Sequence, residues 1–108
     1  MPAAEPPLNL ELLDDEDPFE IDGDNRPHLF SHETFGEDDL DDVWANHPVF
    51  FRARPDGGAD WLMVAEVPGG DVLVVPLAKP HSGQPTKARP IGIYRAGERL
   101  KLRYLEER

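Results

Sequence analysis

Four histidines are the side chains in this sequence best suited to acid–base or metal chemistry. His28 and His32 are four residues apart and Glu33 follows, so a helix would place both imidazoles on one face, at a spacing that metal sites use. The glutamate follows the second histidine instead of the first, which excludes the zinc-protease motif, and a third ligand would have to come from His47 or His81. Packing or surface roles explain these histidines better, so we expect no metal and no other cofactor.

Carboxylates are concentrated between Asp38 and Asp42, where four of five residues are aspartates. Calcium loops interleave glycines and backbone carbonyls among their acids, whereas this run fits the solvated side of an amphipathic helix. The chain has no phosphate loop, no dinucleotide fingerprint and no G-x-S-x-G motif. Its Gly-Gly pairs, at 57–58 and 69–70, belong to turn signals without a following helix.

Cationic side chains in the second half of the chain could bind phosphates. These candidates are Arg52, Arg54, Lys79, Lys87, Arg89, Arg95, Arg99 and Arg103. Cleaving RNA without a metal requires a deprotonated 2′-hydroxyl, a stabilised phosphate charge and a protonated leaving oxygen, which histidine, arginine and lysine can provide. The alternative is that these cations form ion pairs with the surplus acids of the chain.

The net charge of −11 is divided unevenly along the chain. Residues 1–48 contain 15 acids and one base, for a net charge of −14, and residues 49–108 contain 7 acids and 10 bases, for +3. The acidic half disfavours a nucleic-acid partner without excluding one.

The sequence has no cysteine, no apolar run as long as a membrane span and no signal-peptide pattern, so we expect a cytoplasmic protein without membrane contact.

Residues 1–17 combine three prolines with six acids, which opposes both helix formation and apolar collapse. We therefore expect a disordered acidic tail, followed by a single α+β domain over residues 18–108. The leucines of the tail, at positions 8, 10, 12 and 13, leave a second interpretation open. They could dock onto a partner or onto a neighbouring copy of the chain.

The stretch from Asp60 to Ala78 predicts a β-hairpin, because two apolar runs flank a Pro-Gly-Gly-Asp turn signal. Strands over Val49–Arg54 and Arg89–Arg95 would extend it to a four-stranded antiparallel meander, with a short strand at Phe19–Ile21 before it. Pro76 would remove a hydrogen-bond donor from the hairpin, so we expect a bend there and a cleft close to His81.

Helices are predicted on both sides of this meander in the sequence. A short one should run from Arg26 to His32, and a second should begin at a capping box formed by Thr34 and Glu37. The C-terminal stretch, Ala96–Arg108, predicts a helix that lies over one face of the sheet. Its inward side chains would be Leu100, Tyr104 and Leu105. The expected class is α+β, with a short strand, two helices, the meander and a final helix.

Three stretches of the chain share a pattern with a known family. The first, PFEIDGDNRPHLFSH from Pro18 to His32, contains a short aromatic strand and an Asp-x-x-Asn turn, and Phe35 and the Leu40–Trp44 stripe follow it. The second is the strand VLVVPLA, and the third is RPIGIYRA, which begins at Arg89 and leads into a basic helix ending near Tyr104. Over residues 18–105 the chain resembles the BrnT toxins of type II toxin–antitoxin modules.

The resemblance implies a RelE-like fold, metal-independent ribonuclease activity and an antitoxin partner. It suggests His32 as the acid–base group and Arg89 and Arg95 as partners of the phosphate. The cations expected to bind RNA are Arg52, Arg54, Lys79 and Lys87. The chain departs from the family where a Lys-His-Gly is Ser31-His32-Glu33 and where a Ser-Ala-Arg is Gly92-Ile93-Tyr94, with Arg95 one place later.

A different class of function stays open beside this one. The acidic first half and the missing lysine also fit an interaction module without catalytic activity. Such a module would bind a basic partner through Glu37–Asp42, or form a homodimer through an exposed strand edge or the leucine-bearing tail.

Overall fold

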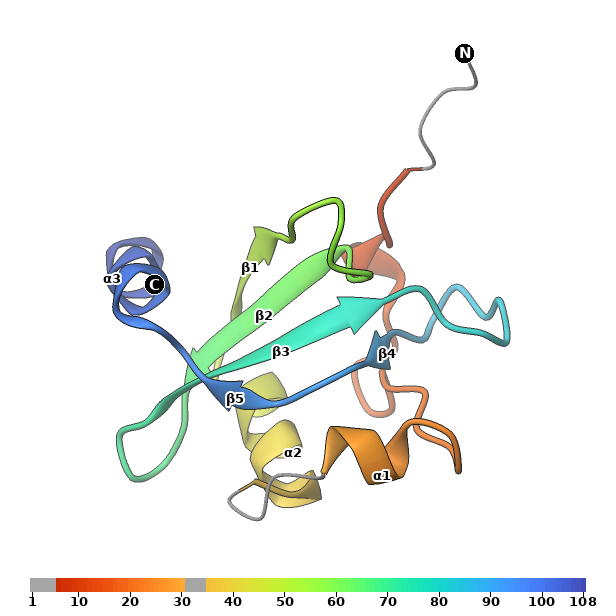
Figure 1. The fold of residues 1–108 in the computed structure, drawn as a ribbon, viewed down its shortest axis with the longest axis horizontal. Coiled ribbons are helices and arrows are strands. Elements are labelled where there is room, and N and C mark those ends of the chain that lie inside the picture. Colours follow the sequence, from red (N-terminus) through yellow and green to blue (C-terminus); the bar gives the residue numbers. More distant parts are fainter. Residues whose placement is uncertain (1–5, 31–34) are drawn as a thin grey trace.

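A computed structural model describes residues 6–30 and 35–108, and in this part of the chain it is an α+β fold, as predicted (Figure 1). Its elements in order are η1 (Leu10–Leu12), α1 (Arg26–Leu29), α2 (Glu37–Ala45), β1 (Val49–Arg52), β2 (Trp61–Glu66), β3 (Val72–Ala78), β4 (Arg89–Pro90), β5 (Tyr94–Arg95) and α3 (Glu98–Glu107).

The hairpin of β2 and β3 is the centre of the sheet, with β1 beside β2 and with β4 and β5 beside β3 (Figure 1). All these pairings are antiparallel, which confirms the predicted meander. Gly69 and Gly70 have φ angles of 104° and 97°, which suit glycine in the turn between β2 and β3. The strand expected at Phe19–Ile21 is reduced to one parallel bridge between Phe19 and Ala88.

Pro76, in the third strand of the meander (β3), interrupts the neighbouring fourth strand and divides it into β4 and β5. The third strand itself stays continuous. The Pro76 carbonyl accepts a hydrogen bond of 3.1 Å from the Ile91 N–H, so the Pro76 nitrogen also faces the fourth strand. That nitrogen cannot donate, and pairing stops there, between β4 and β5. Our prediction of a bend in the third strand is therefore wrong, because the interruption falls on the fourth strand instead.

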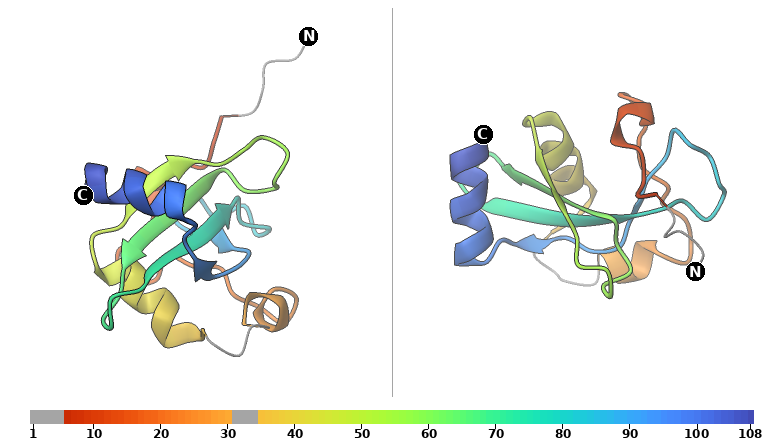
Figure 2. Two further views of the ribbon diagram at one scale, coloured as in Figure 1. Left: turned by 60° about the vertical axis from the view of Figure 1, so that its left-hand side comes forward. Right: turned by 90° about the horizontal axis from the view of Figure 1, so that it is seen from above.

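The two faces of the sheet contribute to separate clusters of buried side chains. On one face, Met63 and Leu73 pack with Leu29 of α1 and Leu40 of α2. On the other face, Val64, Val74 and other strand residues pack with Tyr104 of α3, which lies across the front of β1 and β2 in the left view of Figure 2. Among the described residues, no helix is long and apolar enough to cross a membrane.

Residues 6–17 are ordered against the sheet, which corrects the expected disordered tail. Leu8 and Leu13 are each 7% exposed and belong to the cluster that contains α1 and α2. The Leu8 N–H donates to Asp60 Oδ2 at 2.7 Å, and Trp61 Nε1 donates to the Leu8 carbonyl at 2.7 Å. The acids of this segment stay in solvent while two leucines bury apolar area on the sheet. Residues 1–5 lie outside the described part.

The helices differ from the predicted ranges mainly at their ends. α1 ends at Leu29, and the expected capping residue Thr34 lies outside the described residues. The N-cap of α2 is Gly36, whose N–H donates to Asp39 Oδ2 at 2.9 Å. In α3, Tyr104 is buried as expected but Leu105 is 39% exposed, because the helix turns only a narrow side toward the sheet.

Candidate functional site

Arg89, predicted as a phosphate partner, is instead buried in an ion cluster. The residue is 5% exposed, and its Nη1 atom donates at 2.9 Å to both Glu20 Oε1 and Asp22 Oδ2. The Asn25 side chain completes the junction by donating to the carbonyls of Glu20 and Pro90 at 2.9 and 3.3 Å. Arg89 thus anchors residues 20–25 to β4, and its side chain is unavailable to a substrate in this arrangement.

The cluster also perturbs the ionisation of its carboxylates. Burial raises the pKa of Glu20, but hydrogen bonds from Ser82, the His81 N–H and Arg89 outweigh it and bring the pKa to about 2. For Asp22, the hydrogen bond from Arg89 lowers the pKa far below its usual range. Both groups are therefore ionised at neutral pH and hold Arg89 in place.

The two lysines expected to bind RNA also have acidic partners. Lys79 Nζ lies 3.4 Å from Asp60 Oδ2, and Lys87 Nζ lies 2.6 Å from Asp17 Oδ2. The Lys87 side chain is only 19% exposed, so the pair with Asp17 helps to fasten the N-terminal segment. Ion pairing with the surplus acids, the alternative raised for these cations, is what the structure shows for both lysines.

Arg52 and Arg95 lie on aromatic rings. The Arg52 guanidinium is 5.0 Å from the Trp61 ring centroid, and that of Arg95 is 5.2 Å from the Phe35 ring centroid. Arg95 Nε also lies 3.5 Å from Asp71 Oδ1. Phe35 directly follows residues 31–34, so Arg95 contacts the residue that leads out of the segment containing His32. His32 itself lies outside the described residues.

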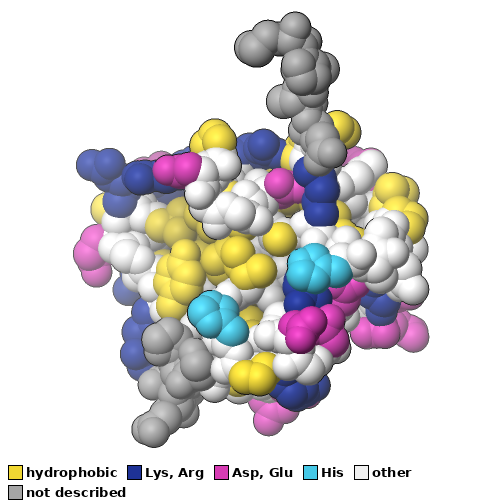
Figure 3. All heavy atoms as spheres, turned by 45° about the vertical axis from the view of Figure 1, so that its right-hand side comes forward, with side chains coloured by type: hydrophobic (Ala, Val, Ile, Leu, Met, Phe, Trp, Pro, Cys, Tyr) yellow, Lys and Arg dark blue, Asp and Glu magenta, His cyan; other side chains and the backbone are white. Residues whose placement is uncertain are grey.

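A hollow surface opens on the sheet face that α3 covers only in part, and hydrophobic side chains gather there in Figure 3. It consists of two adjoining hollows of about 300 and 380 Å³ that share Leu62, and we call it the open groove. Its lining is Ala53, Arg54, Gly57, Ala59, Leu62, Pro76, Ile91, Tyr94, Gly97, Glu98, Arg99, Leu100 and Arg103. A cleft near Pro76 was expected, but His81 does not line it.

Three arginines surround the open groove. In the described part of the chain, neither Arg54 nor Arg99 forms an ion pair. Arg103 lies one helical turn after Arg99, and its guanidinium is 4.5 Å from the Phe51 ring centroid. Tyr94, in the edge strand β5 beside β3, is 43% exposed, and partial burial raises its pKa. The groove therefore offers cations, an apolar floor and one accessible aromatic ring.

All three arginines are phosphate candidates by sequence, but only Arg54 was included in the predicted RNA site. Arg99 and Arg103 are at i and i+4 on a helix whose sheet-facing residues include Leu100 and Tyr104, so this spacing could have placed both on one side of it. Pro76 was the one sequence signal for the groove, and its extent along α3 had none, because the groove arises where α3 stops short of Pro76 and Tyr94.

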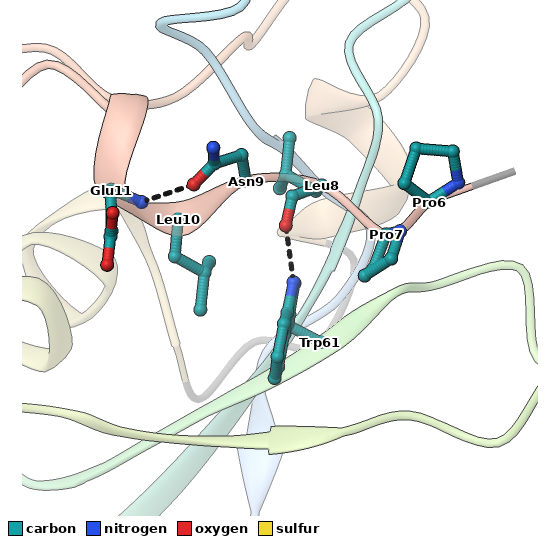
Figure 4. A pocket seen from close by; sticks show the side chains of 7 residues that line it. All are labelled: Pro6, Pro7, Leu8, Asn9, Leu10, Glu11 and Trp61. Atoms are coloured by element: carbon teal, nitrogen blue, oxygen red, sulfur yellow. Dashed lines mark hydrogen bonds between the residues drawn. The ribbon is translucent and has the colours of Figure 1, made fainter.

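Another hollow, of about 520 Å³, lies between the N-terminal segment and β2 (Figure 4). Figure 4 shows Trp61 pointing up to the Leu8 carbonyl, with Pro6 and Pro7 on one side and Leu10 and Glu11 on the other. Glu11 is the only acidic or basic side chain among the described residues that line it, so this hollow presents no set of groups for acid–base catalysis.

No group of three or more His, Cys, Asp or Glu side chains that could hold a metal ion occurs among residues 6–30 and 35–108. His32, which the sequence pairs with His28 as a possible metal ligand, lies outside these ranges.

Comparison with known proteins found no matching family model, curated protein or solved structure. The function must therefore be argued from the residues of this chain.

Proposed function

We propose that this chain is a BrnT-like, toxin-related protein that binds single-stranded RNA in the open groove. The observation that carries the proposal is the segregation of its cations. Lys79, Lys87 and Arg89 are held by carboxylates, whereas Arg54 and Arg99 have no such partner in the described chain and lie at the groove with Arg103. The order of the helices and the antiparallel meander supports the RelE-like layout that the resemblance implies.

The chemistry of the groove suits a single strand. Arginine guanidinium groups donate two parallel hydrogen bonds to a phosphate, and exposed aromatic rings stack on unpaired bases. Tyr94 and Arg54 line one hollow and Arg99 and Arg103 line the adjoining one, so a base on the tyrosine ring and its flanking phosphates could be held together. Duplex RNA needs a longer basic surface, which this acidic protein does not provide.

Cleavage in this proposal falls to His32 with Arg95. The described groove contains no histidine, and its only carboxylate is that of Glu98. Support for the pair comes from the contact of Arg95 with Phe35, three residues after His32. Arg95 pairs with Leu73 and contacts Phe35, on the face opposite the groove, so the RNA strand would pass round the sheet edge at β5. There Arg95 would stabilise the charge on the phosphate while the imidazole moves a proton. Arg89, which the resemblance also suggested, takes no part because Glu20 and Asp22 occupy it.

Fluorescence anisotropy with a labelled single-stranded RNA tests binding. We expect Arg99→Ala and Arg103→Ala to weaken binding, each by roughly 5- to 20-fold, as loss of a charge-assisted hydrogen bond implies. Arg108→Ala is the matched control, because Arg108 is the C-cap residue of the same helix but its Nη1 lies 3.7 Å from Glu66 Oε1, outside the groove. An equal loss in all three variants, or no binding by the wild type, would refute the groove as the RNA site.

Cleavage is tested separately by incubating the protein with total RNA. We expect products from the wild type and none from His32→Ala or Arg95→Ala. Cleavage that survives both substitutions would refute the catalytic assignment but leave the binding assignment intact.

An interaction module without catalysis is the second candidate, and the aliphatic floor of the groove favours it. Leu62, Pro76 and Ile91 would accept apolar side chains of a protein partner better than they would accept bases. The arginines then select acidic residues on that partner, unlike the basic partner that the acids of Glu37–Asp42 led us to expect. Co-purification with the product of a neighbouring small gene tests this, and Arg99→Glu with Arg103→Glu should abolish it. Copurification that survives this double reversal would exclude the groove as the partner site.

A further inference from the structure

The N-terminal segment and the open groove are on opposite faces of the sheet. Leu8 and Leu13 pack in the cluster with Met63 and Leu73, whereas Leu62, at the centre of the groove, packs with the cluster on the other face. The acids of the segment are therefore held away from the groove of their own molecule. Charge complementarity between the two surfaces can be satisfied only between molecules.

One part of this segment combines an exposed leucine with acidic side chains, which complements the apolar and basic lining of the groove. Leu12, in η1, is 52% exposed although its neighbour Leu13 is buried. The exposed acids Glu11, Asp14 and Asp15 flank it, and we call these four residues the acidic knob. Among the described residues, the other large exposed apolar side chains are Leu102 and Leu105, on α3, and Tyr94, in the groove itself. Leu12 is thus the one among them with acidic neighbours on both sides.

Hydrogen bonds hold the backbone of the knob at Asp14. Asp14 Oδ1 accepts hydrogen bonds from the N–H groups of Glu16 and Asp17 at 2.9 and 3.3 Å, which lowers the pKa of Asp14 and keeps it charged. The Asp14 N–H donates to the Thr86 carbonyl at 3.0 Å. Little conformational entropy would be lost when such a preorganised turn docks.

We propose that the acidic knob of one molecule docks into the open groove of a second copy, an inference that rests on the groove being a binding surface. Leu12 contacts the aliphatic floor at Leu62 and Ile91, and the carboxylates meet Arg54 and Arg99. The two surfaces differ, so the contact is heterologous and leaves each pair with one free knob and one free groove. The carboxylates take the places of RNA phosphates, so self-association and RNA binding exclude each other.

Two variants separate the halves of this contact, and both alter exposed side chains. Leu12→Glu disables the knob, and Arg54→Glu with Arg99→Glu disables the groove. Sedimentation velocity of the full chain at low salt should show association of the wild type that grows with concentration, and only monomer for either variant alone. An equimolar mixture should give a one-to-one complex and nothing larger, because it contains one intact knob and one intact groove.

Each result decides a different point. A wild type that stays monomeric, or variants whose mixture stays monomeric while the wild type associates, overturns the docking proposal. RNA anisotropy in the same samples then reports on the groove itself. If the wild type is monomeric yet binds RNA, self-docking fails and the proposed function stands; if it neither associates nor binds RNA, both fail. Agreement requires that Leu12→Glu lose association but keep RNA binding, and that Arg54→Glu with Arg99→Glu lose both.

Discussion

At the scale of single residues, partners distant in sequence decide which cations are available. In the sequence, Arg89 looks like a phosphate ligand because Arg89 and a second arginine, Arg95, flank a predicted strand. Its carboxylate partners, Glu20 and Asp22, precede it by 69 and 67 residues. Their proximity depends on the bridge between Phe19 and Ala88, a single parallel pairing that alternation of apolar residues cannot predict.

The same cluster predicts how stability depends on pH. The cluster lowers the pKa of Glu20 to about 2 in the folded protein, against 4.5 in the unfolded chain, so the unfolded chain takes up this proton at a higher pH than the folded one does. The stabilisation is complete above about pH 4.5 and is lost as the pH falls toward 2. Urea unfolding between these limits should show a declining free energy of unfolding, with a smaller slope for Glu20→Gln. Equal slopes would contradict the assignment.

At the scale of elements, the N-terminal segment shows how composition can mislead. Its acids and prolines predicted disorder, yet Leu8 and Leu13 fill part of the sheet face that α2 leaves uncovered. The meander was predictable because its alternation and turn residues are local signals. The split of β4 from β5 was not, because it depends on Pro76 facing the fourth strand instead of β2.

A pair of leucines tests whether this segment belongs to the fold. Leu8→Ala should lower the free energy of unfolding by about 2–3 kcal/mol, because it leaves a cavity beside Trp61. Leu12→Ala is the matched control; its side chain is 52% exposed, so the change should stay within about 0.5 kcal/mol. Denaturant unfolding measures both, and equal small effects would mean that the segment does not pack on the sheet in solution.

The start of α2 can be tested in the same way. Asp39→Ala removes the acceptor of the Gly36 N–H and should cost about 1 kcal/mol of stability. Asp41→Ala, on the exposed side of the same helix, removes an equal charge without removing this bond. Thermal unfolding should therefore separate the two variants, and identical melting temperatures would place the cap elsewhere.

At the scale of the whole molecule, acids and free arginines are separated by the sheet. The chain carries a net charge of −11, yet Arg54, Arg99 and Arg103 gather on the face opposite the acidic N-terminal segment. An RNA strand approaching from a distance would be repelled, and one in the groove would be attracted. Salt shortens the range of the repulsion to about 10 Å at 0.1 M, so above this concentration the local attraction should determine affinity.

RNA affinity above 0.1 M salt should therefore follow the number of phosphates held by the groove. Each phosphate contact to a single strand contributes about −0.7 to the slope of log K against log salt, so three arginines predict a slope of about −2. Arg99→Ala should reduce its magnitude by about 0.7, and Arg108→Ala should leave it unchanged. Anisotropy titrations at several salt concentrations measure these slopes. A wild-type slope near zero would mean that apolar contacts hold the ligand, which would favour a protein partner in the groove over RNA.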